Sequence, residues 1–210
     1  MKWIVSILSA AFLLFSLTAC GNGHTDPETT DTSGGLPAGS EAGTAGRRDN
    51  EKTILIAYFT RTGNTRTIAE MVAAETGGTL FQVETVIPYP DDYDTCTAQA
   101  QQEQDENARP ALSTHIGDME RYDVVFIGYP IWWGTMPMAM FTFLEEYNLS
   151  GKTVIPFCTH GGSGLGRSVG DIRQLTPAST IPEGLAIAGS SAEKAGPDVK
   201  AWIDGLDIIR

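Results

Sequence analysis

The stretch Thr60-Arg61-Thr62-Gly63-Asn64-Thr65 follows directly on an apolar run, residues 53–59, and opens a segment with helical periodicity. Three hydroxyls, a glycine that lets the backbone approach a ligand, and free amides at a helix start together favour binding of an anion. A phosphate monoester can be held in such a cradle without a paired cation. Thr and Asn are also ordinary capping residues, so a plain helix cap is the alternative interpretation.

Outward from this stretch, apolar runs alternate with helical segments. The predicted strands are residues 53–59, 79–86, 123–129, 152–158 and 185–188. The first, third and fourth are nearly continuous in apolar residues, which is typical of strands buried on both faces. Helical spacing follows the first, third and fifth strands, at Ile68 and Val72, at Met138, Phe141 and Leu144, and at Val199, Ile203 and Leu206. This alternation predicts an α/β fold, a doubly wound parallel sheet with helices on both faces.

Residues 87–122 form a long crossover between the second and third predicted strands. Asp91 or Asp92 is expected to cap a polar helix that runs through Asn107, and Pro110 ends it. The acidic cluster at the start of this helix complements the helix dipole, and we favour that role over a cation site.

The stretch from Ile56 to Val72 resembles the flavodoxin signature. The positions that match it are Tyr58, Thr60, Gly63, Thr65, Ala69 and Val72. Ala57 departs from it, because flavodoxins usually carry a larger apolar residue there. The resemblance implies a five-stranded parallel sheet in the order 2-1-3-4-5, with FMN at the switch point of the sheet. It also implies that the FMN phosphate is held by Thr60, Arg61, Thr62, Gly63, Asn64 and Thr65.

A second loop follows the third predicted strand: Tyr129-Pro130-Ile131-Trp132-Trp133-Gly134-Thr135-Met136-Pro137. In the strand order 2-1-3-4-5, this loop faces the cradle. A Trp offers a flat apolar face to a flavin ring. Trp133-Gly134 resembles the Trp-Gly of flavodoxin loops, and the stretch from Pro130 to Pro137 equally resembles the flavin loop of NAD(P)H:quinone reductases. We predict that Trp133 contacts the ring, with Trp132 second. The predicted cofactor-binding residues of this loop are Tyr129, Pro130, Ile131, Trp132, Trp133 and Gly134.

A third loop, Thr159-His160-Gly161-Gly162-Ser163-Gly164-Leu165-Gly166-Arg167-Ser168, follows the fourth predicted strand. Its glycine-rich backbone can approach the flavin edge and donate amide hydrogen bonds. Flavodoxins usually place a Tyr here, whereas this stretch has no aromatic residue and begins like the Thr-Thr-Gly-Gly turn of quinone reductases. One face of the ring is therefore expected to stay open. The predicted cofactor-binding residues are Thr159, His160, Gly161, Gly162, Gly164 and Gly166.

Other chemistries fit the third loop poorly. Arg167 stands where a Walker A element needs Lys, and Leu165 where a nucleophile elbow needs Gly, which argues against an ATPase and a serine hydrolase. His160 is either a proton donor near the flavin or a hydrogen-bonding neighbour, since His titrates near neutrality.

The N-terminus has the pattern of a targeting signal. Lys2 precedes an apolar run of residues 3–17, and Leu17-Thr18-Ala19-Cys20 resembles the lipobox of bacterial lipoproteins. We expect a signal peptide over residues 1–20, a lipid on Cys20, a flexible tether over 21–52 and one FMN domain over 53–210. An ordinary secretory signal is the alternative. The expected location is exported and lipid-anchored, on the periplasmic or extracellular face of the membrane.

The net charge restricts the partners that the chain can have, and the cysteine count restricts its disulfides. The chain carries 14 basic and 26 acidic residues, a net charge of −12, which argues against a nucleic-acid partner. Beyond Cys20, only Cys96 and Cys158 remain, and we expect both to be unpaired thiols.

Three functions remain open on this basis. The first is an electron carrier for redox partner proteins or small-molecule acceptors, and the second an NAD(P)H-dependent reductase of quinones or other acceptors. The third is a binding lipoprotein of the same fold without redox activity. The phosphate cradle and the Trp pair argue against the third, whereas the missing outer aromatic keeps the second open.

Overall fold

The computed structural model describes residues 52–206, so the predicted signal peptide, Cys20 and nearly all of the tether lie outside the described residues. Five parallel strands form one sheet in the order β2-β1-β3-β4-β5, which confirms the predicted fold and strand order. The strands are β1 (Ile54–Tyr58), β2 (Thr79–Gln82), β3 (Val124–Pro130), β4 (Thr153–His160) and β5 (Leu185–Ala188). Within the described range, no helix is both long enough and apolar enough to cross a bilayer.

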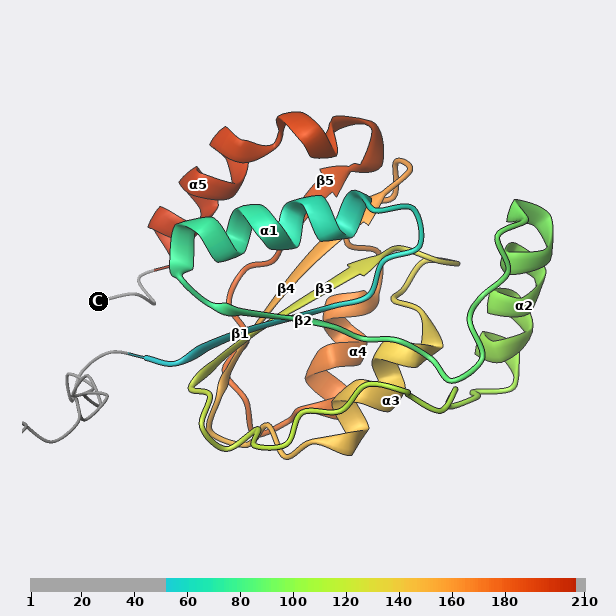
Figure 1. The fold of residues 1–210 in the computed structure, drawn as a ribbon, viewed down its shortest axis with the longest axis horizontal. Helices are drawn as coiled ribbons and strands as arrows, with labels where there is room; N and C mark the ends of the chain where they lie inside the picture. Colours follow the sequence, from blue (N-terminus) through green and yellow to red (C-terminus); the bar gives the residue numbers. More distant parts are fainter. Residues whose placement is uncertain (1–51, 207–210) are drawn as a thin grey trace, which may run out of the picture. The chain divides into compact units, whose positions relative to one another are not determined.

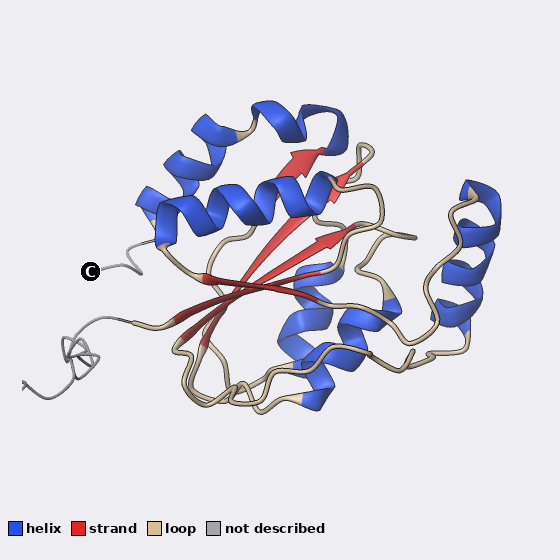
Figure 2. Cartoon of the chain, in the orientation of Figure 1, coloured by secondary structure: helices blue, strands red, loops and turns tan. Residues whose placement is uncertain are grey.

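Two helical layers cover the sheet. The helices are α1 (Asn64–Thr76), α2 (Tyr93–Asp105), α3 (Met138–Glu146), α4 (Ser168–Leu175) and α5 (Gly196–Gly205), with a 3-10 turn, η1 (Gly189–Lys194). Helices α1 and α5 lie on one face and α3 and α4 on the other, whereas α2 stands to one side of both layers (Figure 1; Figure 2).

Alternating residues of the central strands pack against the two helical layers. Ile54 and Ile56 pack under α1 and α5, whereas Leu55 and Ala57 face α3 and α4. Because successive strand side chains point to opposite faces, a buried strand must be apolar at every position, as the sequence of β1 is. The two cores fix the sheet, and the loops after β1, β3 and β4 therefore emerge at the same edge.

The elements differ from the sequence-based boundaries at a few points. The strand predicted over 79–86 ends at Gln82, because the chain then leaves the sheet and Thr85 bridges Leu112 of the crossover. The crossover helix begins as predicted, since the Asp92 side chain accepts a hydrogen bond from Thr95 N at 2.9 Å, but it ends at Asp105 rather than Asn107. Helix α4, which buries Ile172, was not predicted, because the glycine run before it masks its short apolar pattern.

Both cysteines of the domain are unpaired, as predicted, and both are also buried. Burial raises the pKa of the Cys158 thiol to about 12. These two thiols are therefore packing residues in the described structure.

Candidate functional site: a cofactor cradle and an adjoining aromatic cavity

The loop between β1 and α1 forms the predicted cradle. Gly63 takes a left-handed conformation, with φ of 91°, and α1 begins at the next residue. The backbone N–H of Gly63 donates to Thr60 Oγ1 at 3.1 Å. Within residues 52–206, no hydrogen bond engages the backbone N–H groups of Thr62, Asn64 or Thr65. Free amides at the start of a 13-residue helix make a site for an anion.

The two arginines of this stretch turn away from the cradle. The Arg61 guanidinium donates to the carbonyl oxygens of Pro90 and Asp91, and Arg66 Nη2 donates to Gln82 Oε1 at 2.6 Å. The cradle therefore offers amides and hydroxyls to an anion. The predicted contact of Arg61 with the phosphate is not made by its guanidinium, because the carbonyls of Pro90 and Asp91 engage it.

A buried hydroxyl pair ties the cradle to the neighbouring strand. Thr65 Oγ1 and Thr159 Oγ1 lie 2.9 Å apart, and both side chains are buried. Since Thr65 belongs to α1 and Thr159 to β4, this bond fixes the start of the helix against the sheet edge.

The cradle opens into a cavity of about 520 Å³ at the carboxyl edge of the sheet, within the usual size range of cofactor sites. The structure brings all three loops together here, as predicted. The cavity is lined by Thr62, Asn64, Pro130, Ile131, Thr159, His160, Gly161, Gly162, Ala188, Gly189 and Ser190.

The last three lining residues were missed by the sequence analysis. They follow β5, whose carboxyl end meets the same edge as the other strands. A Cβ atom on Gly189 would lie 3.0 Å from Asn64 Nδ2, so the Asn64 side chain approaches this backbone closely. A glycine directly after the fifth apolar run was the signal that could have pointed to this segment.

The glycine-rich loop after β4 is shaped by backbone conformations that favour glycine. Gly162, Gly164 and Gly166 have φ angles of 136°, 58° and 53°. A Cβ on Gly166 would lie 2.2 Å from Gly134 O, and Arg167 N donates to the same oxygen at 2.9 Å. Gly164 and Gly166 therefore shape this loop and dock it on the loop after β3; neither is among the residues that line the cavity.

His160 has one ring nitrogen engaged. Its Nδ1 accepts a hydrogen bond from Gly162 N at 2.9 Å, so a neutral ring carries its proton on Nε2. His160 is also among the residues that line the cavity.

The loop after β3 closes in a tight two-residue turn. Trp132 N donates to Thr135 O at 2.8 Å and Thr135 N to Trp132 O at 3.1 Å, with Trp133 and Gly134 at φ 48° and 82° between them. These are the features of a type I′ turn. Positive φ is rare for a bulky residue such as Trp133, and outliers of this kind concentrate at functional sites.

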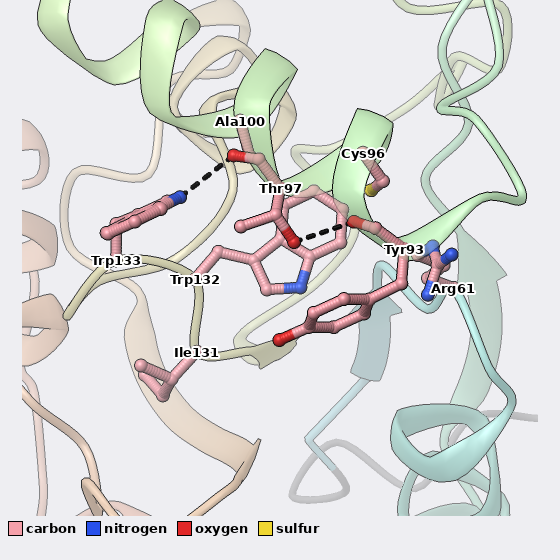
Figure 3. Close-up of a pocket in the computed structure, with 8 residues that line it drawn as sticks. All are labelled: Arg61, Tyr93, Cys96, Thr97, Ala100, Ile131, Trp132 and Trp133. Carbon is pink, nitrogen blue, oxygen red and sulfur yellow. Dashed lines mark hydrogen bonds between the residues drawn. The ribbon is translucent and has the colours of Figure 1, made fainter.

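The two indoles occupy different environments. Trp132 packs edge-on against Phe59 and Tyr89, with ring centroids 5.5 and 5.0 Å away. Trp133 is 47% exposed, and its Nε1 donates to Thr97 O of α2 at 3.0 Å (Figure 3). The structure thus places Trp132 in a packed aromatic cluster, and the contact between Trp133 and a flavin ring stays a prediction.

Both indoles line a second cavity, of about 270 Å³, between this loop and α2 (Figure 3). Its lining residues are Arg61, Tyr93, Cys96, Thr97, Ala100, Ile131, Trp132 and Trp133. Ile131 lines both cavities, so the second one adjoins the first.

The Tyr129 side chain does not reach either cavity. It is fully buried, and its hydroxyl lies 2.9 Å from Ser168 Oγ. Burial raises the pKa of this phenol above its usual range. Of the predicted residues in the second loop, Pro130 and Ile131 are those that meet the phosphate cradle.

Comparison with known proteins identifies the family of the chain. The flavodoxin family profile matches residues 53–206. A solved structure from Bacteroides eggerthii, described as a candidate flavoprotein, is 37% identical, covers 75% of this chain and 99% of its own, and superposes with a TM-score of 0.66. A similar candidate flavoprotein from Bacteroides uniformis is 31% identical over 74% of this chain and 99% of its own, also with a TM-score of 0.66.

A more distant solved structure is a flavoprotein from Lactobacillus acidophilus in complex with FMN. It is 23% identical, covers 68% of this chain and 97% of its own, and has a TM-score of 0.58. No curated protein matches the chain. The chain belongs to the flavodoxin family, which confirms the resemblance seen in the sequence.

Proposed function

We propose that this protein is an FMN-binding flavoprotein that carries electrons at a membrane surface. The observation that carries the proposal is the set of free amides at the start of α1, which opens into a cavity lined by the glycine-rich loop. FMN is the cofactor, and its phosphate monoester matches an anion site that no side-chain cation enters. Family membership and the FMN complex of the Lactobacillus relative support this assignment.

Different residues of the chain are assigned to different parts of the cofactor. Thr62, Asn64 and Thr65 would donate their free amides to the phosphate, and the Thr65–Thr159 bond holds the helix start in place. Gly161 and Gly162 let the backbone approach the ring, and His160 Nε2 can hold a proton at the cavity wall. Bound FMN supplies one- and two-electron redox chemistry that the side chains lack.

Purified protein should be yellow and release FMN when denatured. Gly63→Ala should weaken FMN binding about 5- to 30-fold, because a left-handed Ala costs about 1–2 kcal/mol and the free loop can relieve this strain by leaving the cradle conformation. Gly77→Ala is the matched control: Gly77, at φ 69°, ends the same helix, and a Cβ added at either glycine would have no other atom within 4 Å. Titration of the apoprotein with FMN measures both.

A colourless protein that does not take up added FMN would reject the cofactor assignment. It would favour a binding lipoprotein of the same fold. Equal loss of FMN affinity in both glycine variants would show that the effect is one of stability rather than of the cradle.

The charge distribution supports a carrier over a nucleotide-dependent reductase. Arg167 Nε pairs with Asp171 Oδ2 at 3.3 Å, while Arg61 and Arg66 point away from the cavity. In the described part of the chain, these arginines of the three loops leave no cation aimed into the cavity for a nucleotide's pyrophosphate. The alternative, an NAD(P)H-dependent acceptor reductase, is favoured by the third loop, which has no aromatic residue to cover the ring.

Stopped-flow mixing tests this choice. NADH and NADPH should reduce the bound FMN slowly, whereas dithionite should reduce it readily. Rapid, saturable bleaching by either nucleotide, followed by turnover with a quinone, would assign the reductase instead.

The membrane location rests on Leu17-Thr18-Ala19-Cys20, which lies outside the described residues. Cys20→Ser should move the protein from the membrane fraction to the soluble fraction and abolish labelling by a fatty-acid analogue. Unchanged fractionation would contradict the lipid anchor and leave the FMN assignment untouched.

A further inference from the structure

We propose that a third cavity, formed by α2 together with residues 85–89 and 108–111 on either side of it in the chain, binds a small aliphatic ammonium ion. The cavity measures about 320 Å³. It shares no lining residue with the cofactor cavity or with the cavity beside the Trp pair. The inference therefore goes beyond the proposed function and does not depend on FMN binding.

Much of the lining of this cavity is aliphatic. The residues that contribute no hydrogen-bonding side-chain group are Val86, Ile87, Ala108, Pro110 and Ala111. Val86 is 60% exposed and Ile87 78%, so two adjacent β-branched side chains lie largely in solvent at this site. Exposed apolar surface that borders a concave site is typical of ligand binding. The alkyl part of a ligand would remove this surface from water.

Glu103 brings a carboxylate to the same cavity. Its Oε2 accepts a hydrogen bond from Tyr89 Oη at 2.6 Å, and its Oε1 accepts one from Gln99 Nε2 at 2.8 Å. A carboxylate can accept about four hydrogen bonds, so each oxygen has capacity left for a ligand. Within residues 52–206, no Lys, Arg or His lies within ion-pair distance of Glu103.

Tyr89 donates its proton to this carboxylate and keeps it. Burial raises the pKa of the Tyr89 phenol, and the hydrogen bond to Glu103 raises it further. The phenol is therefore a donor at neutral pH, and the negative charge stays on Glu103. The Tyr89 ring packs edge-on against Phe59, with ring centroids 5.5 Å apart, so the group that holds the carboxylate is itself held by the core.

Arg109, the one basic residue that lines this cavity, is already neutralised. Its Nε and Nη2 donate to the two carboxylate oxygens of Glu145, both at 2.7 Å. Its Nη1 donates to the carbonyl oxygens of Asn107 and Ala108 at 2.9 and 3.0 Å. Because Glu145 offsets the charge of Arg109, the Glu103 carboxylate is the uncompensated charge of the cavity, and a cationic ligand complements it.

Backbone hydrogen bonds hold the walls of the cavity in place. Val86 N donates to Ala111 O at 2.9 Å, which joins the two segments on either side of α2. Ala108 N donates to Glu103 O at 2.8 Å, which fixes the residues after α2 against the helix end. A site that is formed before the ligand arrives loses less conformational entropy on binding.

Charge and shape together define the ligand class. The aliphatic lining favours a branched or cyclic alkyl group, and Glu103 favours an ammonium group beside it. A hydrogen bond between two charged groups is about twice as strong as one between neutral groups. An ammonium ion should therefore bind more tightly than an alcohol of the same shape.

The test compares three probes: cyclohexylmethylammonium, cyclohexylmethanol, which has the same shape without the charge, and cyclohexanecarboxylate, which has the opposite charge. The full chain, purified in mild detergent and saturated with FMN, is titrated at pH 7 by calorimetry and by saturation-transfer NMR. We expect saturable binding of the ammonium ion with a dissociation constant of about 1 mM or tighter. The alcohol should bind at least about fivefold more weakly, and the carboxylate should not bind.

Two glutamate variants test the role of the charge. Glu103→Gln keeps an acceptor for the Tyr89 hydroxyl but removes the charge, so it should weaken the ammonium ion at least about fivefold and leave the alcohol unchanged. Glu106→Gln is the matched control. Glu106 caps the end of the same helix and does not line the cavity, and it accepts from Gln102 Nε2 at 2.9 Å much as Glu103 accepts from Gln99. Glu106→Gln should bind both probes as the unaltered protein does.

A third variant tests the location. Ala111 is exposed and lines the cavity, so Ala111→Leu would partly fill the cavity without crowding the core, and it should weaken the ammonium ion and the alcohol alike. FMN affinity should stay unchanged in all three variants, because none of these residues lines the cofactor cavity. Circular dichroism checks that each variant is folded.

Three outcomes would overturn the proposal. The first is no saturable binding of the ammonium ion, and the second is binding of the alcohol as tight as that of the ammonium ion. The third is an equal loss in Glu103→Gln and Glu106→Gln with both variants folded, which would show that the net charge acts at long range rather than through this cavity. A chain that binds the ammonium ion but no FMN would contradict the proposed function and leave this inference standing.

Discussion

The two cavities that meet at Ile131 are built from different materials. The cofactor cavity is made of backbone amides, hydroxyls and glycines at the ends of β1, β3, β4 and β5. The second cavity is made of aromatic side chains and the face of α2, which belongs to the long crossover between β2 and β3. The sheet topology dictates the first, because the ends of parallel strands converge. The second depends instead on where the crossover packs, because α2 supplies one of its walls.

The largest expected effect on stability lies where the glycine-rich loop after β4 docks on the loop after β3. Gly166→Ala should lower the free energy of unfolding by about 3 kcal/mol, because a left-handed Ala is strained and its Cβ would collide with Gly134 O. Gly161→Ala, in the same loop but with no atom within 4 Å of its Cβ, should change it by less than about 0.5 kcal/mol. Urea unfolding measures both, and equal values would show that the two loops are not rigidly docked.

The loop after β3 carries one packed indole, Trp132, and one exposed indole, Trp133. Trp132→Ala should destabilise the fold by about 2–3 kcal/mol, below the range for a fully buried Trp because this side chain is partly exposed. Its ring loses the edge-on contacts with Phe59 and Tyr89. A change below about 1 kcal/mol by urea unfolding would mean that this cluster contributes little to the fold.

Trp133→Ala should act on the cofactor more than on the fold. If the exposed indole stacks on the flavin, its loss should raise the FMN dissociation constant about tenfold, or about 1.4 kcal/mol, and more than Trp132→Ala does. Fluorescence titration of both apoproteins decides the ranking. A larger loss of affinity in Trp132→Ala would reverse the roles predicted for the pair.

The smallest effect concerns the hydroxyl pair behind the cradle. Thr65→Val should lower the free energy of unfolding by about 1 kcal/mol, because it leaves the buried Thr159 hydroxyl without its partner. Thr67→Val is the control: its hydroxyl makes a longer bond, 3.3 Å, to Gly63 O and is only half-buried. Thermal unfolding of the two apoproteins checks the difference, and a neutral Thr65→Val would show that this bond does not fix the helix start.

Local sequence patterns predicted most of the fold. Continuous apolar runs identify β1, β3 and β4 because a strand covered on both faces has no polar side, and the Asp92 cap marks where α2 begins. Patterns failed where neighbours in space decide the structure. The edge strand β2 stops early because the crossover takes over its pairing, and α4 is short and follows four glycines.

The sequence by itself determined the phosphate cradle, since a Thr-Gly-Asn-Thr turn between a strand and a helix places free amides by local geometry alone. Tertiary structure decided which side chains share a cavity with it. Nothing in the chain order brings Ser190 into one cavity with Thr62, or turns Arg61 toward Pro90 and Asp91. Tertiary structure also gives Trp132 and Trp133 different surroundings, because the type I′ turn points these two adjacent indoles in different directions. Such contacts depend on the packing of segments distant in sequence, which no local pattern encodes.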